Sequence, residues 1–176
     1  MSGAPPALPD DTKDWTWVIA QGCPECGWTP PPATEIAARV RATVPRWQAV
    51  LRRPDVAART RPERWSALEY ACHVRDVCRV FGGRLTQLLT EDDPTFADWD
   101  QDAAARAGRY FAEDPAAVAL AYERAAGRTA DGFAAVESDQ WERRGTRSNG
   151  SPFTVATLGA YFLHDLEHHL ADVAGG

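Results

Sequence analysis

The sequence contains no apolar run of the about eighteen residues that a membrane-spanning helix needs. This absence excludes a transmembrane protein. The first residues, MSGAPPALPDD, lack both the basic start and the apolar middle of a secretory signal peptide. We therefore expect a cytoplasmic protein.

A surplus of positive charge is also missing, because the 176 residues carry a formal net charge of −6 and the sequence pI is about 5.2. A nucleic-acid-binding protein needs a basic face to displace counterions, so this class is excluded. The hydrophobic and charged fractions, 44% and 25%, are those of an ordinary globular protein, and the length fits a single core. We expect a small-molecule substrate as the partner, with neither nucleic acid nor membrane, and a homodimer is left open.

Cysteine is too scarce for a disulfide scaffold, since the chain has only four, at positions 23, 26, 72 and 78. Cys23 and Cys26 form a C-x-x-C pair in the turn GCPECGW, which is half of a typical zinc site and therefore a second candidate metal site. No second C-x-x-C pair exists to complete it, and a redox dithiol would need a strand-then-helix context that is absent. Reduced thiols or an incomplete zinc site are favoured over redox catalysis.

Strand-like alternation is absent as well, and the chain shows four long helical patterns that begin near residues 34, 66, 114 and 154. Ser66 and Glu69 form a capping box at the start of the second pattern. Residues 1–33 are proline-rich. We therefore expect an irregular N-terminal segment with the CPEC turn (residues 1–33) and an all-α four-helix bundle (residues 34–176). The connection between the second and third helices is long enough for these two helices to run parallel.

Three of the four histidines lie in one stretch of the last helix, LHDLEHHLADV. Because residues four apart share a helix face, this stretch offers two pairs, His164 with His168 and Asp165 with His169. Relative to Leu158 in the apolar stripe, the Asp165 pair lies within about 20°, whereas His164 and His168 lie about 120° and 80° away on the polar side. The helical wheel favours Asp165 and His169 as the inward pair, and His164 with His168 stays open as the alternative register.

The fourth histidine, His73, falls on the apolar stripe of the second helix. A bundle builds metal sites from side chains that project inward from facing helices. Histidines beside acids near a helix C-terminus can equally be solvated surface residues that the helix dipole favours. A core-facing histidine together with an inward acid–histidine pair nevertheless favours a metal site, with His73, Asp165 and His169 as its ligands.

Two stretches, WSALEYACHVRD (65–76) and DLEHHLADV (165–173), resemble the DinB-like superfamily, which includes mycothiol-dependent maleylpyruvate isomerases and bacillithiol transferases. The positions that match its two motifs are Trp65, His73 and Asp76 in the second helix and Asp165, His169 and Asp172 in the fourth. The resemblance implies a four-helix bundle with up-down-down-up topology. The chain departs from the family at Asp165, where the family shows His or Glu.

The resemblance also implies a function, that of a metal-dependent thiol transferase or isomerase acting on a small electrophilic substrate, with a low-molecular-weight thiol such as mycothiol as cofactor. Zn²⁺ is the expected metal, and Ni²⁺ and Fe²⁺ are alternatives, since histidine and carboxylate ligands suit all three. Asp76 and Asp172 are expected to orient the ligand imidazoles. The alternatives are a non-catalytic, stress-associated metal- or ligand-binding protein and a metal-dependent hydrolase that uses bound water as its nucleophile.

Overall fold

The computed structural model describes residues 5–6, 8–9 and 13–174, and it consists mainly of four long helices. These helices are α2 (Ile36–Leu51), α3 (Ala67–Thr90), α5 (Pro115–Ala134) and α6 (Val155–Ala174). The shorter helical elements are α1 (Val18–Gln21), α4 (Gln101–Ala107) and two 3-10 turns at Ala33–Glu35 and Tyr110–Ala112. Each long helix begins within a few residues of its predicted start.

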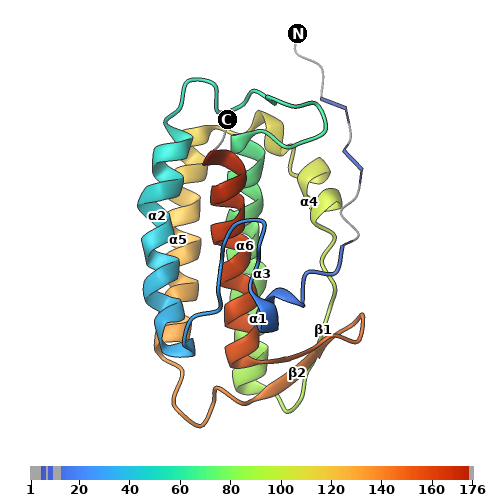
Figure 1. Ribbon diagram of the computed structural model, residues 1–176, viewed down its shortest axis with the longest axis vertical. Coiled ribbons are helices and arrows are strands. Elements are labelled where there is room, and N and C mark those ends of the chain that lie inside the picture. The colour runs from blue at the N-terminus through green and yellow to red at the C-terminus, as the bar shows by residue number, and fades with distance from the viewer. Residues whose placement is uncertain (1–4, 7, 10–12, 175–176) are drawn as a thin grey trace.

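The four long helices form an up-down-down-up bundle (Figure 1). Helices α3 and α5 pack against each other and run in the same direction, and α2 and α6 run opposite to them. The long connection between α3 and α5 runs back along the bundle and carries α4 (Figure 1). The predicted helical bundle and its parallel second and third helices are therefore confirmed.

The start of α3 is fixed by the predicted capping box. The Glu69 backbone N–H donates to the Ser66 hydroxyl at 3.2 Å, and the Ser66 backbone N–H donates to the Glu69 carboxylate at 2.8 Å. Burial raises the pKa of Glu69, but hydrogen bonds from Arg59 and Ser66 outweigh it and keep that pKa below its ordinary value. The cap fixes where α3 begins, and therefore which of its faces carries His73.

Close packing near the start of α6 depends on Gly159. A Cβ atom at this position would lie 2.6 Å from Ile36 Cδ1 and 2.8 Å from Phe133 Cε1. Glycine therefore lets α6 approach α2 and α5 more closely than a larger residue would. Further along, Leu158 and Leu166 of the apolar stripe are fully buried. This packing fixes the rotation of α6 about its axis, on which the position of every histidine in the helix depends.

The absence of strands, expected from the sequence, is wrong for three short segments: β1 (Thr95–Phe96), β2 (Arg144–Arg147) and β3 (Pro152–Thr154). Strands β2 and β3 form an antiparallel hairpin whose turn includes Gly150 at φ +92°, and β1 pairs with β2 in parallel. Strands of two to four residues are too short to show an alternating pattern. The sheet lies at one end of the bundle (Figure 1).

The N-terminal segment, expected to be irregular over residues 1–33, includes helix α1 and lies against α6 (Figure 1). A small apolar cluster apart from the main core joins the two, with Val18, Cys23 and Trp28 packed against Ala160 of α6. Residues 1–4 and 175–176, at the outer ends of the two predicted parts, lie outside the described residues. No helix within the described part of the chain is long and apolar enough to cross a membrane.

Candidate metal centre

The structure brings together His73 from α3 with Asp165 and His169 from α6. The Nε2 atom of His73 and the Nε2 atom of His169 each lie 3.2 Å from Asp165 Oδ1. One candidate ligand atom from each residue lies within 4.8 Å of the others. Helices α3 and α6 pack against each other, so this cluster is held between two rigid elements of the bundle.

Burial and charge act against each other in this cluster. Burial raises the pKa of Asp165, but the facing His73 and His169 outweigh it and hold that pKa well below its usual range. Burial lowers the pKa of His169, but hydrogen bonds with Asp165 and Asp172 outweigh it and raise that pKa to about 9. At neutral pH an ionised carboxylate therefore faces a protonated imidazole.

Asp172 determines which nitrogen of His169 is available to a ligand. The Nδ1 atom of His169 lies 2.8 Å from Asp172 Oδ2. An ionised carboxylate only accepts hydrogen bonds, so Nδ1–H donates to Asp172 and Nε2 of a neutral His169 presents its lone pair to Asp165. Two acceptors in contact repel each other. Either a second proton on His169 or a cation between the ligands removes that repulsion.

His73 is 1% exposed and is enclosed by aromatic rings. The ring of Trp99 is stacked on it with centroids 5.6 Å apart and an interplanar angle of 11°, and the ring of Trp65 lies at 5.3 Å. Among the described residues, His73 Nδ1 has no hydrogen-bond partner. The rings therefore hold the imidazole by packing, with Nε2 directed at Asp165.

The two residues expected to orient the ligand histidines are placed differently. Asp172 contacts His169, as described above. Asp76 instead accepts hydrogen bonds from Arg75, Arg79 and Tyr110. The guanidinium groups are stronger partners for a carboxylate than a neutral imidazole is. The structure therefore does not bring Asp76 to the imidazole of His73.

A cavity of about 250 Å³ borders Asp165 and His169. Tyr70, Tyr161 and Arg64 also line it, and so do His164 and His168 of the alternative pair. The cavity combines apolar surface, hydrogen-bond donors and a positive charge beside the candidate ligands. Such a lining suits a small polar molecule with an apolar part.

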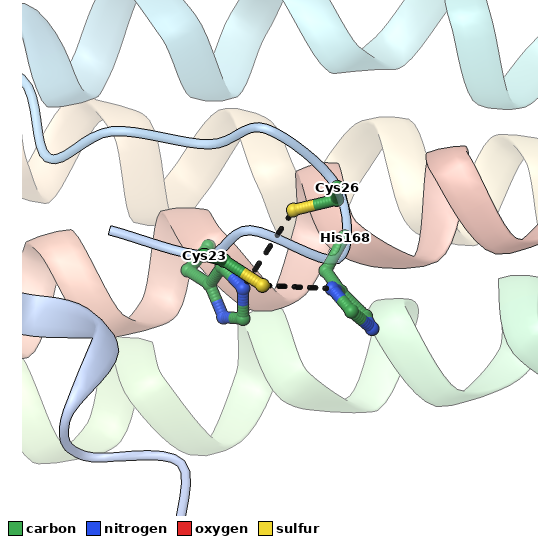
Figure 2. A group of neighbouring side chains, drawn as sticks. Cys23, Cys26 and His168 are labelled. Carbon is green, nitrogen blue, oxygen red and sulfur yellow. Dashed lines mark hydrogen bonds between the residues drawn. The ribbon is translucent and has the colours of Figure 1, made fainter. Parts of the chain in front are cut away.

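The alternative pair, His164 and His168, belongs to a second cluster on another face of α6. The Sγ atom of Cys23 lies 3.7 Å from His168 Nδ1, and the Sγ atom of Cys26 lies 3.9 Å from His164 Nε2. Figure 2 shows Cys23 and Cys26 on the N-terminal loop beside His168 on α6. One candidate ligand atom from each of the four residues lies within 4.8 Å of the others.

His164 lies away from the apolar stripe, as the helical wheel predicted, but that face is not a solvent-exposed polar side, because this residue is only 3% exposed. The N-terminal segment covers that face, and the rings of Trp15 and Trp28 lie 5.9 and 5.1 Å from the His164 ring. The pattern C-x2-C followed by H-x3-H, typical of zinc sites, is present in the sequence. More than a hundred residues separate its halves, so only the fold brings Cys26 to His164.

Comparisons with known proteins agree with the fold. The family model of the DinB superfamily matches residues 54–173. No curated protein matches the chain significantly. Among solved structures, YfiT from Bacillus subtilis is similar, with a TM-score of 0.67 and 18% sequence identity over 81% of this chain and 84% of YfiT. YfiT is described as a probable metal-dependent hydrolase with an unusual four-helix bundle topology. Because the family model matches well over half of its residues, this chain belongs to the DinB superfamily.

Proposed function

We propose that this protein is a metal-dependent hydrolase of a small-molecule substrate and that His73, Asp165 and His169 bind the metal. The observation that carries the proposal is the convergence of two imidazole nitrogens on one carboxylate oxygen, each at 3.2 Å, at the edge of a cavity. The description of YfiT, which shares the fold, supports the same class of reaction.

The donor set fits a divalent cation. Zinc–nitrogen and zinc–oxygen bonds of about 2.0–2.2 Å at tetrahedral angles separate neighbouring ligand atoms by roughly 3.4 Å. The observed 3.2 Å from each histidine to Asp165 is close to that separation. Two imidazoles and a carboxylate suit Zn²⁺, with Ni²⁺ and Fe²⁺ as alternatives. Three protein ligands leave a coordination position for water or substrate, which is typical of catalytic rather than structural sites.

A bound cation of this kind supplies Lewis acidity and lowers the pKa of its water towards neutrality. The surrounding residues prepare the site for that chemistry. Asp172 holds His169 in the tautomer that exposes Nε2, and the charge of Asp165 offsets part of the charge of the cation. Tyr161 also lines the cavity, and a phenolic hydroxyl can donate a hydrogen bond to a substrate oxygen.

The thiol transferase or isomerase activity implied by the sequence resemblance would use the same three ligands, with a thiol in place of water. None of the described contacts identifies a binding site for mycothiol, so hydrolysis is the simpler proposal. A non-catalytic, metal-binding bundle is the third alternative. We also propose that the protein is cytoplasmic and that its substrate is a small molecule.

The test uses the purified full chain, stripped of metal and reloaded with Zn²⁺, Ni²⁺ or Fe²⁺, against a panel of chromogenic esters and amides. We expect hydrolysis that depends on the metal and that falls to background in the Asp165→Asn variant. The matched control is Asp131→Asn, because Asp131 is an exposed acid paired with Arg41 on the surface of the bundle. This control should keep the activity of the unmodified protein.

Two results would contradict the proposal. Turnover that requires mycothiol or glutathione, with the thiol found in the product, would assign the site to thiol transfer. The second result is binding of less than about a tenth of an equivalent of metal at the three ligands under saturating conditions. It would mean that the protein is a non-catalytic scaffold.

A further inference from the structure

The second cluster consists of two sulfur and two nitrogen atoms contributed by distant parts of the chain. Cys23 and Cys26 belong to the N-terminal loop, and His164 and His168 belong to α6. Cys23 and His164 are buried, whereas Cys26 and His168 are partly buried. Neither cysteine forms a disulfide. The proposed hydrolase site uses none of these four residues as ligands.

The distances in this cluster agree with a tetrahedral metal site. Zinc–sulfur bonds of about 2.3 Å and zinc–nitrogen bonds of about 2.0–2.1 Å at tetrahedral angles separate sulfur from nitrogen by roughly 3.6 Å. The observed separations are 3.7 Å between Cys23 and His168 and 3.9 Å between Cys26 and His164. These two separations are therefore close to those of a tetrahedral site, and the four candidate ligand atoms all lie within 4.8 Å of one another.

The backbone of the cysteine turn is shaped for two thiolates that face the same point. Glycines flank the pair in GCPECG, and both Gly22 and Gly27 have φ of +72°, a conformation that other residues rarely adopt. A Cβ atom on Gly22 would lie 2.7 Å from the Trp28 carbonyl oxygen. The Cys23 backbone N–H donates to that same oxygen at 2.8 Å and closes the turn. A tight turn of this kind is typical of zinc-binding C-x-x-C pairs.

We propose that Cys23, Cys26, His164 and His168 bind a structural zinc ion that fastens the N-terminal segment to α6. Four protein ligands fill a tetrahedral zinc ion, so this site has no position for substrate. Two thiolates and two imidazoles select zinc over the harder cations magnesium and calcium. The proposal stands independently of the hydrolase assignment, because the two sets of ligands share no residue.

The zinc ion would stabilise a segment whose own core is small. Among the described residues, the apolar cluster beneath the cysteine turn has four buried members: Val18, Cys23, Trp28 and Ala160. Trp15 and Glu25 of the same segment line the cavity beside Asp165 and His169. By fixing the cysteine turn, the zinc ion would hold one wall of that cavity in place.

The experiment is metal analysis of the purified, reduced full chain after saturation with Zn²⁺ and removal of free metal. We expect about two equivalents in the unmodified protein and about one in the double variant Cys23→Ser/Cys26→Ser. The double variant His73→Ala/His169→Ala should also bind about one equivalent, but at the other cluster. Cys72→Ala is the matched thiol control, because Cys72 is buried in the main core and contacts the Tyr110 carbonyl group. It should retain both equivalents.

Cobalt distinguishes the two clusters even where the double cysteine variant does not fold. Co²⁺ added to the unmodified protein should produce a thiolate-to-cobalt charge-transfer band, and the His73→Ala/His169→Ala variant should keep that band. Full zinc content in the double cysteine variant, or the absence of the charge-transfer band, would overturn the structural zinc site. So would an intact mass showing a Cys23–Cys26 disulfide in protein purified without reductant. Failure of hydrolysis alone would leave the band and the zinc content unchanged and would contradict only the proposed activity.

Discussion

Helix α6 carries two candidate ligand pairs that differ by a shift of one residue. His164 and His168 face the N-terminal segment, whereas Asp165 and His169 face α3. Each pair has the four-residue spacing that places two side chains on one helix face, and one residue turns the helix by about 100°. A single helix of the bundle therefore presents candidate ligands to two clusters at once.

The partners make the two clusters chemically different. The pair Asp165 and His169 is completed by one histidine from α3, and we call this candidate site the open cluster because three protein ligands would leave a coordination position for a reacting molecule. Both pairs border the same cavity, so the difference lies in the number of ligands. The pair His164 and His168 is completed by two cysteines, so its four ligands form a closed site. The number of ligands and the softness of sulfur would thus distinguish the proposed open site from the proposed structural site on the same helix.

The two clusters also differ in whether the residues that complete them lie inside the part of the chain that matches the family model. His73 belongs to the part of the chain that matches the DinB family model, residues 54–173. Cys23 and Cys26 lie outside that part, in the N-terminal segment. The open cluster is therefore built entirely on the family scaffold. The closed cluster also needs the segment that precedes the family match.

The largest expected effect comes from changing two adjacent residues, His168 and His169, one at a time. His169→Ala removes a ligand of the open cluster, and we expect hydrolysis to fall by more than about 100-fold, the upper range for residues that merely support a metal ligand. The protease resistance of residues 13–30 should stay as in the unmodified protein. Metal-dependent turnover and limited proteolysis followed by mass spectrometry measure the two properties.

His168→Ala should show the opposite pattern. We expect loss of about one zinc equivalent and rapid cleavage within residues 13–30, with a much smaller loss of turnover than for His169→Ala. If both variants lose turnover and protease resistance equally, the two clusters form one site and the comparison fails.

The next effect is the order in which a chelator removes the two metals. With three protein ligands, a metal ion in the open cluster would keep a free coordination position that a chelator can attack directly, whereas a metal ion in the closed cluster must first lose a protein ligand. We expect turnover to disappear at least about tenfold faster than protease resistance during treatment with EDTA. Samples taken over time and assayed for both properties measure the order. Simultaneous loss would show that the metals are not held differently.

Much of the open cluster could be predicted from the sequence because each step of the argument is local. The apolar stripe of α6 sets the inward face, and the capping box at Ser66 sets the face of α3 that carries His73. The DinB motif supplied the register between the two helices. The prediction for Asp76 was less successful, because sequence alone does not show that Arg75 and Arg79 compete for its carboxylate.

The closed cluster could not be assembled from the sequence, for a different physical reason. Helix periodicity describes which face of α6 is apolar, and it correctly places His164 away from the Leu158 stripe. It does not show that a second layer of chain covers the polar face. Burial of His164 depends on contacts with Trp15 and Trp28, which are tertiary and long-range. The short strands were missed for a similar reason, since their pairing is set by the ends of the bundle rather than by an alternating pattern.

The smallest expected effect concerns Asp172, the carboxylate that lies near one histidine of each cluster. Its Oδ2 atom lies 2.8 Å from His169 Nδ1 but 3.7 Å from His168 Nε2, so only the first distance is that of a hydrogen bond. Asp172→Asn keeps the shape of the side chain and removes its charge. We expect metal affinity at the open cluster to fall by about 10–100-fold, because His169 loses a charged partner that fixes its tautomer.

The closed cluster should respond much less to the same change, since the 3.7 Å contact with His168 contributes only a weak attraction between the two groups. Competition with a metal indicator measures the affinity of the open cluster, and the thiolate-to-cobalt band reports on the closed one in the same sample. Asp131→Asn serves again as the control for removal of an acidic charge. An equal loss of affinity at both clusters would mean that Asp172 couples the two sites across α6. The open and closed sites would then have separate ligands, but their metal affinities would depend on each other.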